Sequence, residues 1–410
     1  MSMDNKVPEI RFKEFSGAWA ENSVGQLCDF IVPGRTKPQI FDGVIPWVTT
    51  PDITSNCVSK SKIGLAISKD EAKRVGAKIV PKNSIIISCV GDLGLVAKAD
   101  NELIINQQLH AFIPKENINK WFLLYELLTR KKHMENVATK TSVPYMNKDN
   151  CNSIPIIFPS VEEQTQIGDY FQKLDALINQ HQQKHDKLSN IKRSMLEKMF
   201  PKQGETMPEI RFKGFSGGWE EKVLGDEMTV TSVKRILQSD WTVSGVRFLR
   251  ARDIVSAYKN EEPADYLYIA REKYNEYSQL SGKVEVGDLL VTGVGTIGVP
   301  MLITNGEPVY FKDGNIIWFK NENKIDGMFL FYSFVGDLIQ TYIKHSAGTG
   351  TVGTYTINSG KNTPIKLPTR EEQTAIGNYF QKLDALINQH QQQITKLNNI
   401  KQACLSKMFV

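Results

Sequence analysis

Residue types that make or break covalent bonds are present in this sequence, but their spacing does not complete a catalytic motif. Glu71-Ala72-Lys73 supplies half of a nuclease Glu-x-Lys pattern, without a matching acidic pair at a constrained spacing. The string NTPI (Asn362–Ile365) is the nearest to the motif of an amino-methyltransferase, and it is better interpreted as a strand. The stretch SAGTGTVGTY (Ser346–Tyr355) lacks the Gly-Lys-Ser/Thr ending of a P-loop. These patterns disfavour a self-contained methyltransferase or nuclease, and we expect no catalytic residues in this chain.

The cysteines and histidines do not predict a metal centre. The five cysteines are Cys28, Cys57, Cys89, Cys151 and Cys404. They form no CxxC pair and their number is odd, so we expect buried or half-buried thiols rather than a zinc site or disulfides. His181 and His390 have no Cys, Asp or Glu at ligand spacing on their own helical face. We therefore expect no metal and no bound cofactor in this chain.

Composition is that of a globular protein, with 41% hydrophobic and 23% charged residues among 410. No stretch approaches the ~20 continuous apolar residues that a membrane-spanning helix needs, and the start, MSMDNKVPEI, has no signal pattern. We expect a cytoplasmic protein without a membrane partner. The net charge of +5 permits nucleic-acid binding without requiring it.

Arginines, lysines and threonines in loop-like stretches offer the chemistry of DNA binding. Two related stretches differ at their tips: Val48–Pro51 reads VTTP and Leu249–Arg252 reads LRAR, and Asp-Ile follows both. An arginine fork matches O6 and N7 of guanine, and basic residues elsewhere neutralise phosphates. Taken singly, each is more often a solvated surface charge. The residues predicted to contact DNA are Arg35, Lys37, Thr49, Thr50, Arg130, Lys131, Lys132, Lys140, Lys234, Arg235, Arg247, Arg250, Arg252, Lys344, Thr349 and Thr351.

A duplication must position these residues. VPEIRFKEFSGAW at Val7–Trp19 recurs as MPEIRFKGFSGGW at Met207–Trp219. IPIIFPSVEEQ at Ile154–Gln164 recurs as TPIKLPTREEQ at Thr363–Gln373. A period of roughly 200 residues is far longer than the 20–50 of a solenoid. The chain is therefore two tandem copies of one large unit.

The middles of the two copies are related more loosely. SCVGDLGLVA at Ser88–Ala97 lines up with TGVGTIGVPM at Thr292–Met301. Apolar runs such as Ser84–Val90 predict buried strands, and Trp121–Arg130 and Met328–Ile343 are typical of helices. Each middle is predicted to be a mixed α/β domain.

Each copy ends in a segment with the apolar spacing of a coiled coil. From Gln164 to Phe200 and from Gln373 to Phe409, 27 of 37 positions are identical. Apolar residues recur at alternating steps of three and four, as in paired helices, and an antiparallel pair is favoured. The residues predicted to form the contact between the helices are Ile167, Phe171, Leu174, Ile178, His181, Leu188, Ile376, Phe380, Leu383, Ile387, His390 and Leu397.

Residues outside this apolar pattern match as well. A recent duplication would explain their identity, but it would have left the middles equally alike. We therefore predict a face that docks the same partner twice. Its predicted residues are Asp175, Asn179, Gln182, Asp384, Asn388 and Gln391.

These patterns predict an α+β protein with two tandem mixed α/β domains, each followed by a long helix. The predicted bounds are 1–160 for the first domain, 161–201 for its helix, 202–369 for the second domain and 370–410 for its helix. The two helices are expected to pair as an antiparallel coiled coil.

Several segments together resemble the specificity subunits of type I restriction-modification systems. They are GRTKPQIFDGVIPWVTTPDI (Gly34–Ile53), GDLGLVA (Gly91–Ala97), NQQLHAFIP (Asn106–Pro114) and IPIIFPSVEEQTQIGDYF (Ile154–Phe171). The second half repeats the scheme, so the resemblance covers almost the whole chain.

The resemblance implies a non-catalytic DNA reader. Its two target-recognition domains would each read one half of a bipartite, asymmetric site on double-stranded DNA. The helices would set the gap between the half-sites and dock two modification subunits, which use S-adenosylmethionine. Restriction subunits, which use ATP and Mg²⁺, would then join. The alternatives are a scaffold that binds only proteins and a self-contained DNA-modifying enzyme.

Overall fold

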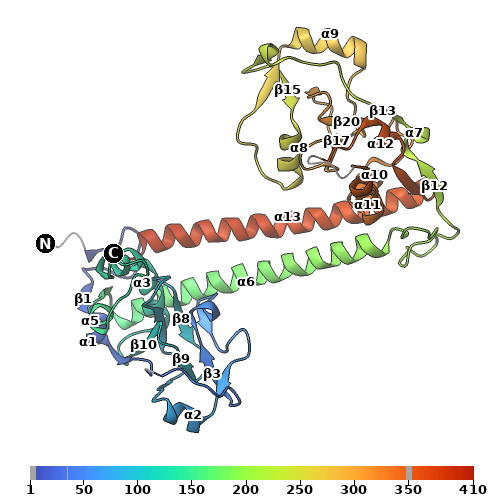
Figure 1. Ribbon diagram of the computed structural model, residues 1–410. Helices are drawn as coiled ribbons and strands as arrows, with labels where there is room; N and C mark the ends of the chain where they lie inside the picture. The colour runs from blue at the N-terminus through green and yellow to red at the C-terminus, as the bar shows by residue number, and fades with distance from the viewer. Residues whose placement is uncertain (1–5, 35, 348–352) are drawn as a thin grey trace. The chain divides into compact units, whose positions relative to one another are not determined.

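In a computed structural model the chain folds into two compact units (Figure 1). The structure describes residues 6–34, 36–347 and 353–410. The first unit comprises residues 1–182 and 392–410, and the second comprises residues 183–391. Each unit therefore contains one mixed α/β domain, the beginning of its own long helix and the end of the other.

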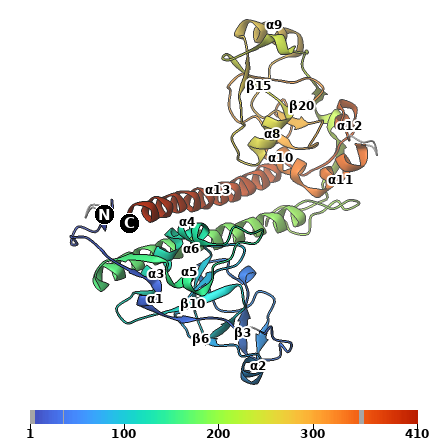
Figure 2. The same ribbon diagram turned by 60° about the vertical axis from the view of Figure 1, so that its left-hand side comes forward.

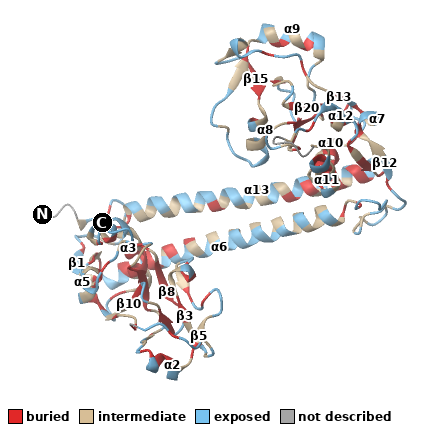
Figure 3. Ribbon diagram, viewed as in Figure 1, coloured by how far each residue is buried: buried red, intermediate tan, exposed pale blue. Residues whose placement is uncertain are grey.

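The first domain is built on three sheets. A two-stranded sheet pairs β1 (Ala20–Ser23) with β11 (Pro155–Phe158). The five-stranded sheet has the order β2 (Cys28–Ile31), β10 (Leu109–Pro114), β7 (Ile85–Ser88), β8 (Val96–Ala99) and β4 (Cys57–Val58). The four-stranded sheet has the order β5 (Ala66–Ile67), β3 (Ile45–Val48), β9 (Leu103–Ile105) and β6 (Ile79–Val80). Strands β7 and β8 are buried along their whole length, and Figure 3 shows this for β8. Fully buried strands read as unbroken apolar runs, which is how the sequence predicts β7.

The first domain also contains short helices. They are α1 (Val24–Leu27), the 3₁₀ turn η2 (Thr50–Asp52), α2 (Lys69–Arg74), α3 (Lys120–Thr129), α4 (Lys131–Val137) and α5 (Lys148–Asn152). Of these, α1 and α3 pack against the strands of the domain. Helix α3 begins at an Asn119 cap, whose side chain accepts hydrogen bonds from the backbone of Trp121 and Phe122. It packs on the first turns of α6 (Val161–Lys198), where the rings of Tyr125 and Phe171 lie 4.9 Å apart (Figures 1 and 2).

The second domain repeats this architecture. A two-stranded sheet pairs β12 (Glu220–Val223) with β21 (Pro364–Leu367). One four-stranded sheet has the order β13 (Thr229–Thr231), β20 (Ile316–Lys320), β17 (Leu289–Thr292) and β18 (Pro300–Leu302). The other has the order β14 (Trp241–Thr242), β16 (Leu267–Ile269), β15 (Val246–Leu249) and β19 (Val309–Phe311). Both domains place one parallel pair in the last sheet, β3 with β9 and β15 with β19. The NTPI string lies in and before β21, as the sequence predicts.

The helices of the second domain differ more from those of the first. They are α7 (Leu224–Glu227), η3 (Gln238–Asp240), α8 (Ala251–Tyr258), α9 (Arg271–Ser281), α10 (Gly327–Val335), α11 (Asp337–Ser346) and α12 (Ile357–Lys361). The predicted helical stretch Met328–Ile343 is confirmed as two helices, because Gly336 adopts an extended conformation (φ −72°, ψ 158°) and separates α10 from α11.

Within each unit, the long helices α6 and α13 (Arg370–Lys407) run antiparallel, as predicted. In the first unit Tyr170 of α6 contacts Cys404, and Asp175, further along, contacts Lys401. In the second unit Lys192 of α6 contacts Asp384, and Phe200, just after the end of α6, packs on Phe380. Each helix has 38 residues.

The core of each domain includes the end of the other domain's helix. Phe409, just after α13, packs against Trp19, Phe122 and Phe171 of the first unit. Phe200, just after α6, packs against Trp219, Phe329 and Phe380 of the second unit. The repeated Lys-Met-Phe ending of the two helices is thus explained by burial in equivalent cores.

All five cysteines are free thiols, and the predicted burial is confirmed, because three are buried and two are half-buried. Within the described part of the chain, no helix is long and apolar enough to span a bilayer.

Candidate nucleic-acid interface and its helical frame

The repeated PEIRFK segment anchors the start of each long helix. Arg11 donates from Nε and Nη2 to the two carboxylate oxygens of Glu163, both at 2.7 Å. Arg211 makes the same fork with Glu372, at 2.7 and 2.6 Å. Both glutamates are almost fully buried. A buried carboxylate requires such a partner, because an unpaired one would carry a large desolvation cost.

The glutamine that follows each glutamate ties the helix to its domain. Gln164 accepts from the backbone N–H of Asn119 at 2.9 Å, and Gln373 accepts from that of Asp326 at 3.0 Å. Asn119 and Asp326 cap α3 and α10. The repeated Glu-Glu-Gln therefore fixes the angle between each domain and its own helix.

Asp175 and Asp384 also make contacts within the protein, which favour a structural role over the predicted role in docking a partner. Asp175 accepts from Tyr125 Oη, Asn56 Nδ2 and Lys401 Nζ at 2.6, 2.5 and 2.6 Å. These donors come from the first domain and from α13, so the carboxylate joins three elements of the first unit.

Asp384 does the same in the second unit, where it accepts from Tyr332 Oη at 2.7 Å and pairs with Lys192 of α6 at 2.5 Å. Burial, and then the neighbouring carboxylate, raise the pKa of Tyr125 and Tyr332 well above the ordinary tyrosine value. Both hydroxyls therefore stay protonated and act as donors.

The residues predicted to join the two helices are divided between the two cores. Ile167, Phe171 and Leu174 are buried in the first unit, where Leu397 packs against the same cluster. Ile376, Phe380 and Leu383 are buried in the second unit, where Leu188 joins them. The remaining four, Ile178, His181, Ile387 and His390, are half-buried.

The predicted docking residues other than the two aspartates lie mostly at the surface. Asn179, Gln182 and Gln391 are exposed, and Asn388 is half-buried beside Asn260, with Nδ2 and Oδ1 3.4 Å apart. Two leucines that the sequence pattern did not single out are stronger candidates for the docking face. Leu177 and Leu386 occupy the same position of the repeat, and they are 43% and 45% exposed. A step-by-step helical projection of the repeat could have placed them outside the apolar stripe.

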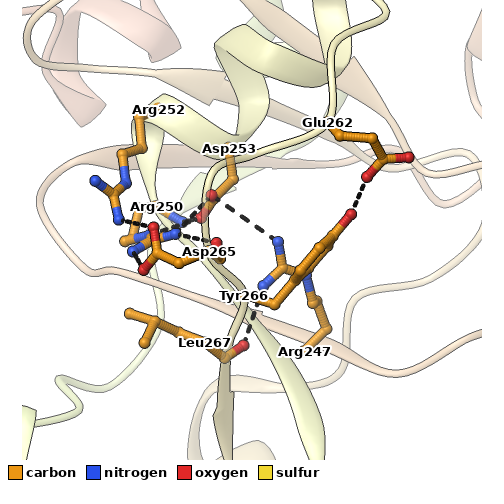
Figure 4. A network of polar contacts seen from close by, with 8 residues as sticks. All are labelled: Arg247, Arg250, Arg252, Asp253, Glu262, Asp265, Tyr266 and Leu267. Atoms are coloured by element: carbon orange, nitrogen blue, oxygen red, sulfur yellow. Dashed lines mark hydrogen bonds and ion pairs between the residues drawn. The ribbon is translucent and has the colours of Figure 1, made fainter. Parts of the chain in front are cut away.

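The tip of the second domain is an ion-pair network (Figure 4). The guanidinium of Arg250 donates to Asp253 from Nε and Nη2, both at 2.9 Å, and to the Asp265 carboxylate from Nη1 at 2.8 Å. It also donates to the Asp265 carbonyl at 2.7 Å. With its fork turned inward and its side chain 13% exposed, Arg250 positions the tip. These contacts favour a positioning role for Arg250 over the predicted contact with guanine.

Two further arginines of this tip differ in exposure. Arg247 lies 4.2 Å from the ring centroid of Tyr266 and donates to the Leu267 carbonyl at 3.2 Å, so it is also held within the domain. Arg252 pairs with Asp265 at 2.5 Å, but its side chain is 61% exposed (Figure 4). Since an exposed ion pair is weak, Arg252 can exchange Asp265 for a phosphate or a base.

The tip of the first domain has the same scaffold with different surface groups. Asp52 accepts from the backbone N–H and the hydroxyl of Thr49 at 2.7 and 2.8 Å, as Asp253 accepts from Arg250. Asp52 also accepts from the backbone N–H of Lys62 at 2.7 Å. Burial acts to raise the pKa of Asp52, but these hydrogen bonds outweigh it and hold the pKa below its ordinary value. The Thr50 hydroxyl donates to Gln108 at 3.2 Å.

The other predicted DNA contacts fall into three groups. Exposed cations are Lys37, Lys131, Lys132, Lys140, Lys234, Arg235 and Lys344. Arg130 is committed to buried Glu126 and to the carbonyl of Val410, so it too is a structural residue. Arg35, Thr349 and Thr351 lie outside the described residues.

Comparison with known proteins places the chain among the type I restriction modification DNA specificity proteins. The model of that domain matches twice, at residues 17–190 and 218–399. The MjaVIII specificity subunit of Methanocaldococcus jannaschii is 24% identical, over 98% of this chain and 95% of that protein. The MjaIX specificity subunit of the same organism is 24% identical over 57% of this chain and 56% of that protein, just over half its length.

A solved structure agrees with the fold. The type I specificity (S) subunit of M. genitalium superimposes with a TM-score of 0.61 at 16% identity, covering 98% of this chain and 99% of that chain. The chain therefore belongs to the family of type I restriction-modification specificity subunits. This confirms the interpretation as a specificity subunit rather than a catalytic one.

Proposed function

We propose that this chain reads a bipartite, asymmetric DNA site for a type I restriction-modification enzyme. Each domain reads one half-site, and the helices set the gap and dock two methyltransferase subunits. S-adenosylmethionine then binds in those partners, and ATP and Mg²⁺ in the restriction subunits that join them. The complex acts in the cytoplasm. Family membership supports the class of this proposal, and the contacts below support its division of labour.

The observation that carries the proposal is a common frame with different surfaces. The Arg11–Glu163 and Arg211–Glu372 forks hold the two domains on their helices in the same way. The loops anchored by Asp52 and Asp253 are equivalent, yet one presents threonines and the other an exposed arginine. A protein that recognises two unlike half-sites needs this combination of constant geometry and variable contacts.

The proposed DNA contacts are the exposed cations, treated domain by domain. In the first domain Lys37, Lys131, Lys132 and Lys140 neutralise phosphates, and Thr49 and Thr50 lie at the reading tip. In the second domain Lys234, Arg235 and Lys344 have the phosphate role, and Arg252 is the side chain most free to reach a base. Phosphate contacts fix the register, and base contacts specify the sequence.

The proposed docking face is centred on the repeated leucines. Lys173, Leu177 and Gln180 are exposed at helical spacing on α6, and Lys382, Leu386 and Gln389 match them on α13. Exposing a leucine side chain to water is unfavourable, and the same leucine is exposed in both copies of the repeat. Each leucine is therefore suited to pack into a partner protein. We propose that each leucine contacts one of two identical partners, together with Asn179, Gln182, Asn388 and Gln391.

The DNA proposal is tested with the complex of this chain and its methyltransferase, bound to a randomised duplex library. We expect selection of two unlike half-sites at a fixed gap. Arg252→Ala should relax or weaken one half-site, and Lys140→Ala should weaken binding to the other. Partner binding without any sequence preference in the DNA would reject the reading function and favour a protein scaffold.

The docking proposal is tested by native mass measurement of the same complex. Leu177→Ser and Leu386→Ser should each lower the occupancy of one of two partners, and the double variant should lose both. Leu280→Ser, an exposed leucine on α9 that is 66% exposed, is the matched control and should bind two. Two bound partners in the double variant would remove the leucines from the interface.

A further inference from the structure

Two thiols and an imidazole from distant parts of the chain meet in the core of the first domain. Cys89 follows strand β7, His110 lies on β10 and Cys151 lies on α5. One ligand atom of each lies within 4.8 Å of the others. The Nδ1 of His110 is 3.3 Å from Cys151 Sγ. All three side chains are buried, His110 at 5% exposure and both cysteines at 0%.

The fold brings them together through backbone pairing. His110 stands opposite Ile87 in the β10–β7 register, two residues from Cys89. The backbone N–H of Met146 donates to the Cys89 carbonyl at 2.9 Å, which draws the segment leading into α5 over the end of β7. Because the three residues are separated by 21 and 41 positions in the sequence, no spacing motif could have predicted the group.

The second domain repeats this backbone arrangement, but it has no thiol or imidazole at the equivalent positions. The backbone N–H of Tyr355 donates to the Gly293 carbonyl at 2.9 Å, as the backbone N–H of Met146 donates to the Cys89 carbonyl. In the β20–β17 register Ile316 pairs with Thr292, as Leu109 pairs with Ser88, so Ile317 is the counterpart of His110.

The counterpart of Cys151 is Gly360, because both stand four residues before the proline that opens the next strand. A Cβ on Gly293 or Gly360 would lie 3.6 or 3.4 Å from the Ile317 side chain. Val230 and Phe319 also lie within 3.2 Å of that position on Gly360, so apolar side chains fill the equivalent space here and the shared backbone requires no thiol or imidazole.

We propose that Cys89, His110 and Cys151 bind a thiophilic divalent cation of the zinc class. Two thiolates and one neutral imidazole are ligands that such a cation prefers over carboxylates. Two thiolates with a divalent cation form a neutral group, which suits a buried position, whereas monovalent copper would leave a net negative charge. Binding releases the two thiol protons to solvent and changes no oxidation state.

The geometry requires little rearrangement. With Zn–S near 2.3 Å and Zn–N near 2.0 Å, tetrahedral donors stand about 3.5–3.8 Å apart, so the widest pair here closes by about 1 Å. Two backbone oxygens border the group, Gln108 O at 3.2 Å from Cys89 Sγ and Met146 O at 3.9 Å from Cys151 Sγ. One of these oxygens or a water completes the fourth position.

The bound cation would link three parts of the first domain. It would tie β10 to the end of β7 and to α5, and so fix the loop between α4 and α5 that carries Lys140 and Tyr145. Metal binding is measured on this chain without DNA or a partner, so it can fail while the proposed DNA-reading function holds.

The test uses the full chain, purified under reducing conditions and stripped with a chelator. Titration with Co²⁺ should give one thiolate-to-cobalt charge-transfer band that saturates at one ion per chain and disappears when Zn²⁺ is added. Zinc should also raise the melting temperature of the wild-type chain. Cys89→Ala and Cys151→Ala should each bind zinc at least about tenfold more weakly. Loss of a group that only hydrogen-bonds to a metal ligand already costs about that much, and these substitutions remove a ligand itself.

Cys57→Ala, at a half-buried thiol of the same domain, is the matched control and should keep the full cobalt spectrum. The wild-type spectrum and its stoichiometry decide the proposal even where a core variant does not fold. No thiolate band in the reduced wild-type chain would overturn it. An unchanged cobalt band in both folded Cys→Ala variants would also overturn it. The same holds if Cys89 and Cys151 form a disulfide and bind no metal.

Discussion

Removing the Asp175 carboxylate should destabilise the first unit without removing a docking contact. In Asp175→Ala three donors lose their common acceptor: the Tyr125 hydroxyl, the Asn56 amide and the Lys401 ammonium group. In Asp175→Asn the shape is kept, but the charge that pairs with Lys401 is lost.

The contacts set the size of the effect. A hydrogen bond to a charged group contributes about 1.5–3 kcal/mol, and a buried donor left without an acceptor costs about 1–3 kcal/mol. Asp175 is 26% exposed and Lys401 15%, so the lower half of each range applies to the ion pair. Tyr125 is fully buried, so its hydroxyl bears the larger penalty. We expect about 3 kcal/mol for Asp175→Ala and about 1.5 kcal/mol for Asp175→Asn.

Urea and thermal unfolding of the full chain measure this directly. For a unit of this size 1 kcal/mol corresponds to roughly 2–4 °C, so Asp175→Ala should lower the melting temperature of the first unit by about 6–12 °C. Asp169→Ala, an exposed aspartate on the same helix, is the control and should stay within about 0.5 kcal/mol. A double-mutant cycle with Lys401→Met isolates the ion pair.

The second unit offers a repeat of the experiment. Asp384→Ala should destabilise the second unit, because the hydrogen bond from Tyr332 and the ion pair with Lys192 are lost. If Asp175→Ala instead unfolds like wild type and fails to bind the methyltransferase, the internal role is refuted. The aspartate would then return to the docking face.

Three further predictions concern single groups of the chain. Arg252→Ala should lower DNA affinity at one half-site and reduce the slope of log affinity against log salt by about 1 if its contact is to a phosphate, as measured by titration at several salt concentrations. Phe409→Ala should cost the first unit about 3–5 kcal/mol in urea unfolding, because the ring is inserted between Trp19 and Phe171. The pKa of Asp52 is lowered by its hydrogen bonds in the folded state, so its stabilisation is full above the ordinary carboxyl value of about 4 and is lost as the pH falls through the lower folded value.

Each of these has a matched comparison. Lys312→Ala, a half-buried cation of the same domain outside the proposed interface, should leave the salt slope unchanged. Phe200→Ala should act on the second unit in place of the first. For Asp52→Asn, the difference in unfolding free energy from wild type should shrink in acid; a difference that is constant from neutral pH to acid would contradict the assigned hydrogen bonds.

The sequence alone determined the duplication and the long helices. Helix formation depends on contacts three and four residues apart, so the apolar spacing and the Glu-Glu-Gln start are visible in the letters. The buried strand β7 is visible for the same reason, since its unbroken apolar run is local. The break at Gly336 was missed because an apolar run across it continues the helical pattern on both sides.

Only the tertiary structure decided what individual side chains do. Periodicity assigns Asp175 to a helical face, but it does not say that Tyr125 and Lys401 stand opposite that face. The tip arginines look alike in sequence, yet Asp253 and Asp265 together hold Arg250 inward, whereas Arg252 pairs with Asp265 alone and stays exposed. Cys89, His110 and Cys151 meet through strand register and a folded-over loop. These roles depend on partners far away in the chain, and sequence spacing carries no record of such distances.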